Sequence, residues 1–469
     1  MRWNRPISPD RFRRLGLNQG AVAFAAALLL FGLIAAVLPT RDLDLGVYWQ
    51  AAQRTFVAQV DPYPRADGEQ LPFTYPPTAL FLIYPFSRLD LADSARLMWG
   101  INLLLVPVLM WLLVSDLART RGASALANPV EDDRADGLPG QRLRVWGPLY
   151  VASFGGIYLT LHFHQVNLLI LLFLWLYWRA LRLGRASYGA GATLALSAVA
   201  KPHYGLLLLA AVRWPGSPLA SQRSSEQGTC QVPSKHAIRP WSRTLSPMVG
   251  AALFGLLLIG VSLLIAPAGS WHSWLSLVLG NTSFTELPPG HSSIAAPWNR
   301  SIPGEVARLL IPNKFSQPLV ASPAAAAWLS TALVLAVTAA TFWLLQDALR
   351  TSWRSRAPPD PRVVDLELSL LSVLVFLAAP ASWTHHLVML LPAALVLLRD
   401  AVLDPSESLS SRLTAALVLA VLALTLDDLI PRDLRVSSQP LMALMTVAVL
   451  ALWLLLMQRL YRLRGGAIG

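Results

Sequence analysis

The sequence predicts an all-α integral membrane protein of the polytopic kind, on the basis of its composition and its recurring apolar stretches. Of its 469 residues, 55% are hydrophobic and only 14% are charged. The mean hydropathy is positive, which lies outside the range of an ordinary soluble domain. Apolar stretches close to the roughly 20 residues that one helical span needs recur along the whole chain. We therefore expect residues 1–469 to form a single polytopic membrane domain.

The apolar stretches also predict the number of spans. Counting them indicates about 12 transmembrane helices, with a range of about 10 to 13. They lie near residues 17–39, 97–116, 145–161, 168–181, 187–200, 204–214, 247–266, 324–346, 366–380, 386–399, 413–426 and 440–458. A further apolar run, Thr78 to Pro85, is too short to cross and follows two prolines, so we expect a helix at the membrane interface there.

The basic residues orient these spans. The formal net charge is +12, and most Lys and Arg residues fall in segments that are cytoplasmic if the N-terminus is cytoplasmic. We therefore expect a multi-pass protein of the cell (inner) membrane with both termini in the cytoplasm. The excess positive charge is a topology signal, and no nucleic-acid partner is expected. The composition, rich in Ala, Arg and Pro, is typical of a GC-rich bacterial source.

Polar motifs gather in the segments that this topology places outside. Residues 40–96 form the first extracytoplasmic loop, with interfacial helices, and residues 267–323 form the second large one. We therefore expect the active site on the extracytoplasmic face. The single cysteine, Cys230, excludes an internal disulfide. Because the sequence shows no cluster of Cys and His, we expect no metal site and no cofactor.

Two carboxylates, Asp42 and Asp44, lie where the first apolar span ends. The apolar positions Leu45, Tyr48, Trp49, Ala52 and Phe56 follow a helical spacing, which predicts an amphipathic helix on the outer membrane face. Asp44 would be its N-cap, a sufficient structural reason for an Asp. It could also be a general base that takes a proton from an attacking hydroxyl. The two carboxylates are two residues apart, so we expect only one to face a site.

Lys201 and the pair His385 and His386 are the candidate phosphate ligands. Lys201 lies between apolar residues at the outer surface, where a lysine is costly unless it snorkels or meets an anion. That anion is either a lipid headgroup or the phosphate of a lipid substrate. The histidines form a tight corner between two spans, and they can donate to phosphate oxygens or simply lie at the interface.

Further polar and aromatic residues are candidates for contacts with a sugar or an acceptor. Tryptophan rings stack on the apolar faces of sugars, although they also anchor membrane interfaces. Amide, guanidinium and hydroxyl groups next to one another suit a sugar or a phosphate. The candidates are Tyr75, Gln165, Asn167, Trp271, Trp274, Trp298, Asn299, Arg300, Ser301 and Trp383.

In their order along the chain, these short motifs resemble glycosyltransferase family 87. The motifs are Asp44-Leu45-Gly46-Val47-Tyr48, Asp61-Pro62-Tyr63, Tyr75-Pro76-Pro77, Gln165-Val166-Asn167, Lys201-Pro202, Asn299-Arg300-Ser301-Ile302 and Ser382-Trp383-Thr384-His385-His386. The resemblance covers most of the chain. Two residues depart from the family pattern: His164 stands where Gly is more usual, and Arg300 where Gln is commoner.

The resemblance implies a multi-span fold of the C type of glycosyltransferases, with an essential Asp in the first outer loop. By motif position that residue is Asp44. It further implies an inverting transferase that moves a hexose, usually mannose, from a polyprenyl-phosphate donor to a lipid or glycan acceptor on the extracytoplasmic face of the bilayer. The alternatives are a flippase or secondary transporter for lipid-linked sugars, and a glycan polymerase that uses a diphosphate-linked donor.

Overall fold

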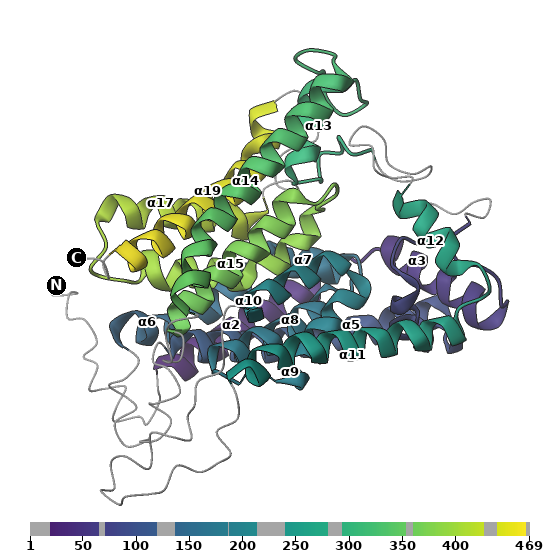
Figure 1. Cartoon of the computed structure of the whole chain (residues 1–469), viewed down its shortest axis with the longest axis horizontal. Helices are drawn as coiled ribbons and strands as arrows, with labels where there is room; N and C mark the ends of the chain where they lie inside the picture. The colour runs from purple at the N-terminus through teal and green to yellow at the C-terminus, as the bar shows by residue number, and fades with distance from the viewer. Residues whose placement is uncertain are drawn as a thin grey trace, which may run out of the picture.

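Residues 19–64, 71–119, 137–185, 187–212, 240–279, 293–352, 360–425 and 439–465 are described in the computed structural model of the chain. Every regular element in these ranges is a helix, and the one β-type pairing there is an isolated bridge between Asn299 and Trp383. The helices pack into an elongated bundle, from which α13 and the start of α14 project (Figure 1). The predicted all-α class is confirmed.

The first half of the chain alternates long helices with short ones. The elements are α2 (Gln19–Val37), α3 (Leu43–Ala52), η1 (Gln53–Val57), η2 (Pro77–Ala79), α4 (Leu80–Ile83), η3 (Tyr84–Arg88), α5 (Leu91–Ala118), α6 (Gly137–Ser153), α7 (Gly155–His162), α8 (Asn167–Arg182), α9 (Tyr188–Ala200), η6 (Pro202–Leu207) and α10 (Leu208–Val212). The predicted interfacial run after Pro77 is thus made of three short helical turns, η2, α4 and η3.

The second half completes the bundle. Its elements are α11 (Pro240–Ile265), α12 (Ser270–Leu279), α13 (Ile302–Leu310), α14 (Pro323–Ser352), α15 (Pro361–Ala378), η8 (Thr384–Leu390), α16 (Leu391–Leu397), η9 (Leu398–Val402), α17 (Leu409–Leu424) and α19 (Gln439–Gly465). The second outer segment, 267–323, therefore holds α12 and α13, and its residues 280–292 lie outside the described ranges.

Six helical stretches in the described ranges are long and apolar enough to cross a membrane. They are Gln19–Val37, Leu91–Ala118, Leu245–Ile265, Pro323–Gln346, Thr384–Val402 and Leu441–Arg464. The prediction of about 12 spans is therefore not confirmed, although each predicted span overlaps a helix. Several of these helices are short: α7 has 8 residues and α9 has 13, whereas a perpendicular crossing needs about 20.

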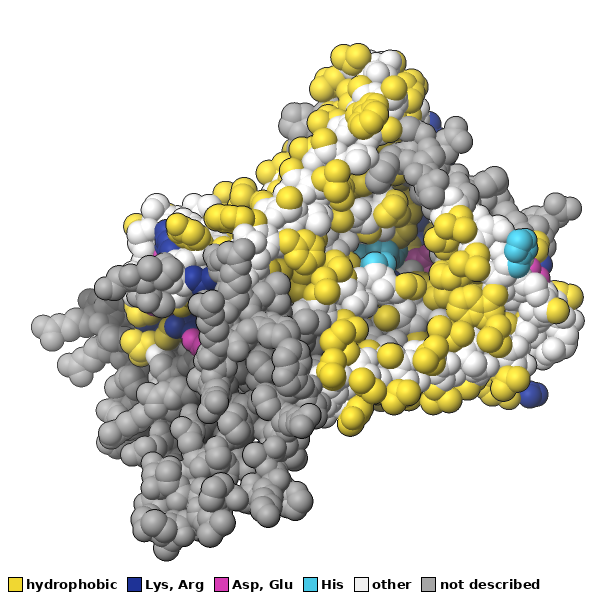
Figure 2. Space-filling view, viewed as in Figure 1, with side chains coloured by type: hydrophobic (Ala, Val, Ile, Leu, Met, Phe, Trp, Pro, Cys, Tyr) yellow, Lys and Arg dark blue, Asp and Glu magenta, His cyan; other side chains and the backbone are white. Residues whose placement is uncertain are grey.

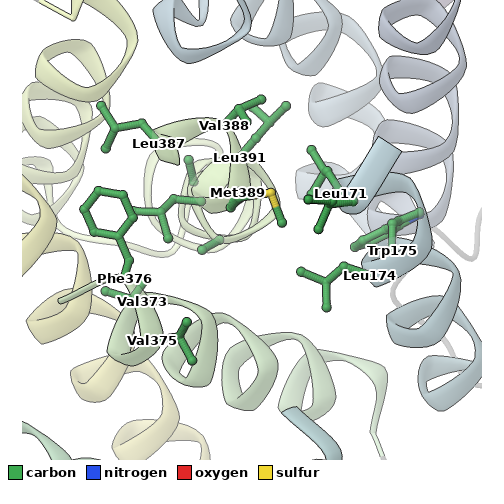
Figure 3. Close-up of a cluster of buried hydrophobic side chains, with 14 of the residues drawn as sticks. Leu171, Leu174, Trp175, Val373, Val375, Phe376, Leu387, Val388, Met389 and Leu391 are labelled. Atoms are coloured by element: carbon green, nitrogen blue, oxygen red, sulfur yellow. The ribbon is translucent and has the colours of Figure 1, made fainter. Parts of the chain in front are cut away.

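The core of the bundle lies where α8, α15 and the segment η8–α16 meet. Side chains from all three contribute to one buried cluster (Figure 3), among them Leu171, Trp175, Phe376, Val388 and Leu391. Each of these side chains is almost completely buried. His385 and His386, called the histidine corner below, lie at the start of η8, so this packing fixes the backbone that carries them.

Glycines allow α9 and α11 to approach closely. A Cβ at Gly191 would overlap the carbonyl of Pro247, and a Cβ at Gly250 would overlap the backbone of Tyr188. Small residues at such crossings are the usual means by which membrane helices pack backbone to backbone. The crossing fixes the start of α9 against α11.

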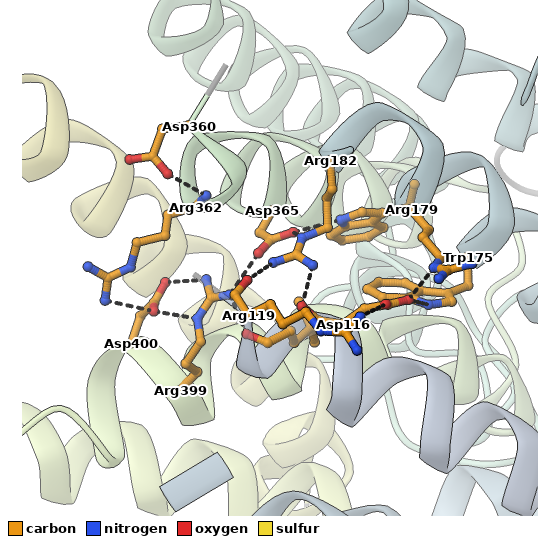
Figure 4. Close-up of polar contacts among 12 residues, drawn as sticks. Asp116, Arg119, Trp175, Arg179, Arg182, Asp360, Arg362, Asp365, Arg399 and Asp400 are labelled. Atoms are coloured by element: carbon orange, nitrogen blue, oxygen red, sulfur yellow. Dashed lines mark hydrogen bonds and ion pairs between the residues drawn. The ribbon is translucent and has the colours of Figure 1, made fainter. Parts of the chain in front are cut away.

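A buried ionic cluster joins α5, α8, α15 and η9 at the ends of these helices opposite the histidine corner (Figure 4). Asp365 accepts from Arg399 at 2.7 Å and pairs with Arg182 at 2.7 Å. Asp116 pairs with Arg179 at 2.9 Å. Buried charges of this kind are tolerated only when they are paired. The cluster therefore fixes the relative positions of four helices without leaving Asp116 or Asp365 unpaired.

Candidate active site

Asp44 lies in the first turn of α3, not at its N-cap as the sequence predicted. The first helical hydrogen bond runs from the N–H of Gly46 to the carbonyl of Asp42 at 2.6 Å, so the helix starts before Asp44 and Asp42 takes the cap position. The side chain of Asp42 makes no capping hydrogen bond. Of the five positions of the predicted apolar face, Leu45, Tyr48 and Ala52 are buried, and Trp49 and Phe56 are half-buried. Asp44 is thus not needed as a cap.

The segment before α3 docks onto the turn that follows α7. The N–H of Arg41 donates to the carbonyl of His162 at 2.7 Å. Asp42 Oδ1 lies 3.2 Å from His164 Nδ1, and the side chain of Asp42 is 47% exposed. The Arg41 hydrogen bond therefore joins the two segments at the rim, where Asp42 lies, while Asp44 points elsewhere, as expected for carboxylates two residues apart on a helix.

His164 adopts a left-handed backbone conformation with φ of 50°. Glycine takes this conformation without steric cost, whereas His is one of the few other residues enriched there. The geometry explains why Gly is more usual at this position of the family pattern. In this chain the imidazole lies 3.2 Å from Asp42, and burial lowers the pKa of His164, which favours the neutral ring.

The carboxylate of Asp44 is the end of a chain of side-chain hydrogen bonds. Gln165 Nε2 donates to Asp44 Oδ2 at 2.6 Å, and the Tyr48 hydroxyl donates to Gln165 Oε1 at 2.6 Å. The hydroxyls of Tyr48 and Tyr75 are 3.0 Å apart. Gln165 and Tyr75, expected to touch a sugar or an acceptor, are therefore joined to the candidate base through the protein itself.

Burial makes Asp44 a stronger base than an exposed aspartate. Burial raises its pKa above the ordinary value, and the Gln165 hydrogen bond and the charges of Lys201 and His162 act in the opposite direction. Asp44 remains partly exposed, so a ligand can reach it. A carboxylate that is both accessible and partly desolvated has the properties of a general base.

Lys201 is buried, with 4% of its surface exposed. Its Nζ has no hydrogen-bond partner among the described residues. Burial lowers the pKa of Lys201 to about 7, although the charge of Asp44 counteracts this shift. An isolated buried ammonium is costly, and an anion that contacts it would remove the cost. Lys201 therefore has the character of an anion-binding residue.

His385 and His386 lie at the start of η8, with ring centroids 4.5 Å apart and nearly perpendicular planes. Lys201 is within electrostatic range of both rings. The carbonyl of His385 accepts from Thr160 and Asn167, each at 3.4 Å. Asn167 thus contacts the backbone of the corner. Figure 2 shows histidine and acidic side chains next to each other in a hollow framed by hydrophobic side chains.

Asn299 and Ser301 bind protein groups. Asn299 Nδ2 donates to the carbonyls of Ile294 and Pro380, and its Oδ1 accepts from the N–H of Ser382. Ser301 caps α13 by accepting from the N–H of Gly304. These contacts tie the second outer segment to the histidine corner. The expected contact of these side chains with a sugar stays a prediction.

Arg300, which follows Asn299 in the sequence, and Trp383, which pairs with it across the backbone bridge, also contact protein groups. Arg300, buried as well, donates to the carbonyl of Met442 at 2.5 Å. Its N–H donates to the carbonyl of Ser382 at 2.7 Å. Trp383 pairs with Asn299 through the backbone bridge and is half-buried. The guanidinium of Arg300 thus holds α19, and its predicted role in acceptor binding remains a prediction.

The three tryptophans of the second outer segment lie in two groups. Trp271 and Trp274 are on α12, with an edge-to-face contact at 5.6 Å, and Trp274 donates to the carbonyl of Thr74 at 3.2 Å. Trp298 packs on Phe315 at 5.3 Å and is 41% exposed. The first group is therefore next to Tyr75, and the second is next to the histidine corner.

No three His, Cys, Asp or Glu side chains in the described part of the chain cluster in a way that could hold a metal ion. The expectation of a site without metal or cofactor remains a prediction. The titratable side chains that act on Lys201 or respond to its charge are Asp44, His203, His385 and His386.

Residues 73–222 match the family model described as Glycosyltransferase family 87. The family resemblance is confirmed over these residues, whereas its expected extent over most of the chain stays a prediction. The match supports a glycosyltransferase, and the apolar helices indicate a membrane protein. Comparisons with curated proteins and with solved structures gave no match. Tyr75, Gln165, Asn167 and Lys201 lie inside the region matched to family 87, whereas Asp44 and the two histidines lie outside it.

Sequence analysis missed Tyr48 and Asn102 as parts of the site. Tyr48 lies four residues after Asp44, on the same face of α3, and that spacing could have pointed to it. Asn102 is a buried amide in an otherwise apolar helix, and it donates to the carbonyl of Gln165 at 3.0 Å. Polar residues within membrane helices are commonly functional, so Asn102 carried a signal. Along α5 it lies about 21 Å from Asp116 of the ionic cluster.

Proposed function

We propose that the chain is an inverting glycosyltransferase that moves a hexose, with mannose the expected sugar, from a polyprenyl-phosphate donor to a lipid or glycan acceptor. The site would lie on the extracytoplasmic face of the cell membrane. One observation carries the proposal: a partly buried carboxylate, Asp44, shares an electrostatic environment with Lys201, a buried ammonium without a hydrogen-bond partner among the described residues. The match to glycosyltransferase family 87 supports the class of reaction.

In this proposal Asp44 removes the proton of the acceptor hydroxyl. The hydroxyl oxygen forms a bond to the anomeric carbon of the sugar from the side opposite the phosphate, which inverts the configuration. The bond between that carbon and the phosphate oxygen breaks, and its electron pair stays on the phosphate. General base catalysis of this kind typically contributes about 10² to 10⁴-fold in rate.

The leaving phosphate gains negative charge as the bond breaks, and Lys201 is the group that would stabilise it. A buried ammonium acts strongly because little water screens it. Bound phosphate would also favour the charged form of Lys201, whose pKa burial lowers to about 7. His385 and His386 are expected to donate to the other phosphate oxygens.

The donor is tested with purified protein in liposomes. Radiolabelled polyprenyl-phosphate mannose is expected to label a lipid or glycan product, and labelled nucleotide-mannose is not, provided that conversion between the donors is blocked. Label that reaches product only from the nucleotide sugar would contradict the proposed donor.

The base is tested with Asp44→Asn. This variant should bind the donor as well as the unaltered protein does, but lose about 10²-fold or more of its transfer rate. Asp42→Asn is the matched control: its carboxylate is two residues away and half-exposed, paired with His164, and activity should be kept. If the protein were a transporter, its Asp44→Asn variant would still move lipid-linked sugar across the bilayer. Full transfer activity of that variant would exclude Asp44 as the base.

A further inference from the structure

A chain of side-chain hydrogen bonds ends at the carboxylate of Asp44. It runs from Tyr75 through Tyr48 and Gln165 to that carboxylate. We infer that Gln165 is a positioning residue, which holds the Asp44 carboxylate so that one defined oxygen faces the acceptor hydroxyl, and that Tyr48 sets the orientation of the Gln165 amide. The inference rests on the proposed role of Asp44 as general base.

Chemistry decides which way the Gln165 amide faces. An ionised carboxylate only accepts hydrogen bonds, so the amide nitrogen must point to Asp44 and the amide oxygen to Tyr48. The phenol of Tyr48 then has to donate to that oxygen, which it does at 2.6 Å. Burial raises the pKa of Tyr48 well above its ordinary value, so the phenol keeps its proton. Its own oxygen remains an acceptor for the Tyr75 hydroxyl.

The backbone of Gln165 is held on both sides. Its N–H donates to the carbonyl of Thr160 at 2.9 Å, and its carbonyl accepts from Asn102 Nδ2 at 3.0 Å. His164, the preceding residue, is in the left-handed conformation, which turns the chain sharply out of α7. The amide is therefore mounted on a rigid turn, and such supporting groups orient the reactive side chains that they touch.

The arrangement leaves the two carboxylate oxygens of Asp44 in different environments. Oδ2 accepts from Gln165 at 2.6 Å, whereas Oδ1 accepts no hydrogen bond from any described residue. The proton from an acceptor hydroxyl can thus go to Oδ1 while Oδ2 keeps its bond to Gln165 in both protonation states. Because only one oxygen is available, the acceptor must approach from one side, which is the geometric benefit of a fixed base.

Gln165→Leu removes the amide at nearly constant volume. The hydrogen bond stabilises the ionised form of Asp44, so its loss should raise the pKa of Asp44 by about 1 pH unit. The acidic limb of the kcat profile should therefore move to higher pH by about that amount. At the optimum, kcat should fall by about 10 to 100-fold, with KM for the donor changed little. Lys201 and His162, and the phenols of Tyr48 and Tyr75, also act on or near Asp44 and are unchanged in this variant.

Tyr48→Phe should have a smaller effect of the same kind, because the amide keeps one partner. The double variant should lose no more than Gln165→Leu alone, since both changes act through the same amide. Tyr150→Phe is the matched control. It removes a phenol that donates to the carbonyl of Leu419 at 3.2 Å, between α6 and α17, and it should leave the pH profile unchanged.

Direct titration of the carboxyl separates this inference from the proposed function. Infrared difference spectra of the unaltered protein contain a protonated-carboxyl band of Asp44, assigned by its absence in Asp44→Asn. In Gln165→Leu this band should appear at a pH higher by about 1 unit. An unchanged titration of the band, or a loss of kcat without a shift of the acidic limb, would overturn the positioning role. Absence of transfer in the unaltered protein would refute the proposed function alone, because the infrared titration does not depend on turnover.

Discussion

Replacing Lys201 by Met removes a buried cation and keeps an unbranched side chain of similar length. Nζ of Lys201 has no hydrogen-bond partner among the described residues, and burial lowers the pKa of this lysine from 10.5 to about 7. At about 1.4 kcal/mol per pH unit, this difference corresponds to about 5 kcal/mol of destabilisation when the lysine is charged. We therefore expect Lys201→Met to be more stable than the unaltered protein at pH 6, by up to about that amount.

The sign of the pH dependence follows from proton binding. Between pH 7 and pH 10.5 the unfolded chain holds a proton on Lys201 that the folded chain has lost, so the unaltered protein gains stability as the pH rises. The advantage of Lys201→Met should shrink over the same interval and vanish above it. Other titratable groups also act on this lysine or respond to its charge, namely Asp44, His203, His385 and His386. Because the unaltered protein and Lys201→Met both contain these groups, the difference in stability between them at each pH cancels most of the groups' own titration.

Thermal unfolding in detergent at a fixed heating rate, followed by tryptophan fluorescence, measures the effect. Addition of a short-chain polyprenyl phosphate at pH 6 should stabilise the unaltered protein and leave Lys201→Met unchanged. Arg399→Met is the contrasting control: this cation is buried but paired with Asp365 and Asp400, so its removal should destabilise the protein by about 3–5 kcal/mol. Lower stability of Lys201→Met at pH 6, or a stability difference independent of pH, would refute the reasoning.

Three further predictions test the frame around the site, each by the same unfolding assay. His164→Gly should be as stable as the unaltered protein or more so, and His164→Val should lose at least about 1 kcal/mol, because φ is 50° there; equal stability of both variants would contradict this. Gly191→Leu should unfold at a lower temperature because its side chain would overlap the Pro247 carbonyl, whereas Gly255→Leu, with nothing within 4 Å of its Cβ, should not. Asn299→Ala should cost about 3 kcal/mol or more because several buried partners lose their hydrogen bonds, and a loss below about 1 kcal/mol would show that Asn299 does not support the corner.

Local sequence patterns were sufficient to predict a helix and its buried face where the apolar residues recur with helical periodicity. The spacing of Leu45, Tyr48 and Ala52 predicted α3 and its buried face. The anomaly of Lys201, a charge between apolar residues, marked it as a candidate before any fold was known, and it is buried. These inferences held because helix periodicity, and the contrast between a charged residue and its apolar neighbours along the chain, are properties of the local sequence.

Other inferences depended on contacts that no local pattern contains. Asn299 and Ser301 carry the same donor and acceptor groups whether they face a sugar or the backbone of the histidine corner, and only packing distinguishes the two. The number of spans was equally uncertain, because an apolar helix buried among other helices has the composition of one that faces lipid. Within the part of the chain that the structure describes, six stretches are long enough to cross, although twelve apolar blocks were counted.

The residues alone were enough to indicate the helical class, the membrane environment and the resemblance to glycosyltransferase family 87, since these depend on composition, periodicity and short motifs. They were not enough to distinguish Asp42 from Asp44. That distinction required segments far apart in the chain: Gln165 donates to Asp44 and the charge of Lys201 acts on it, while Asp42 lies 3.2 Å from the ring of His164. The chemical character of a carboxylate depends on which charges and donors surround it in space, and only the packed bundle brings them together.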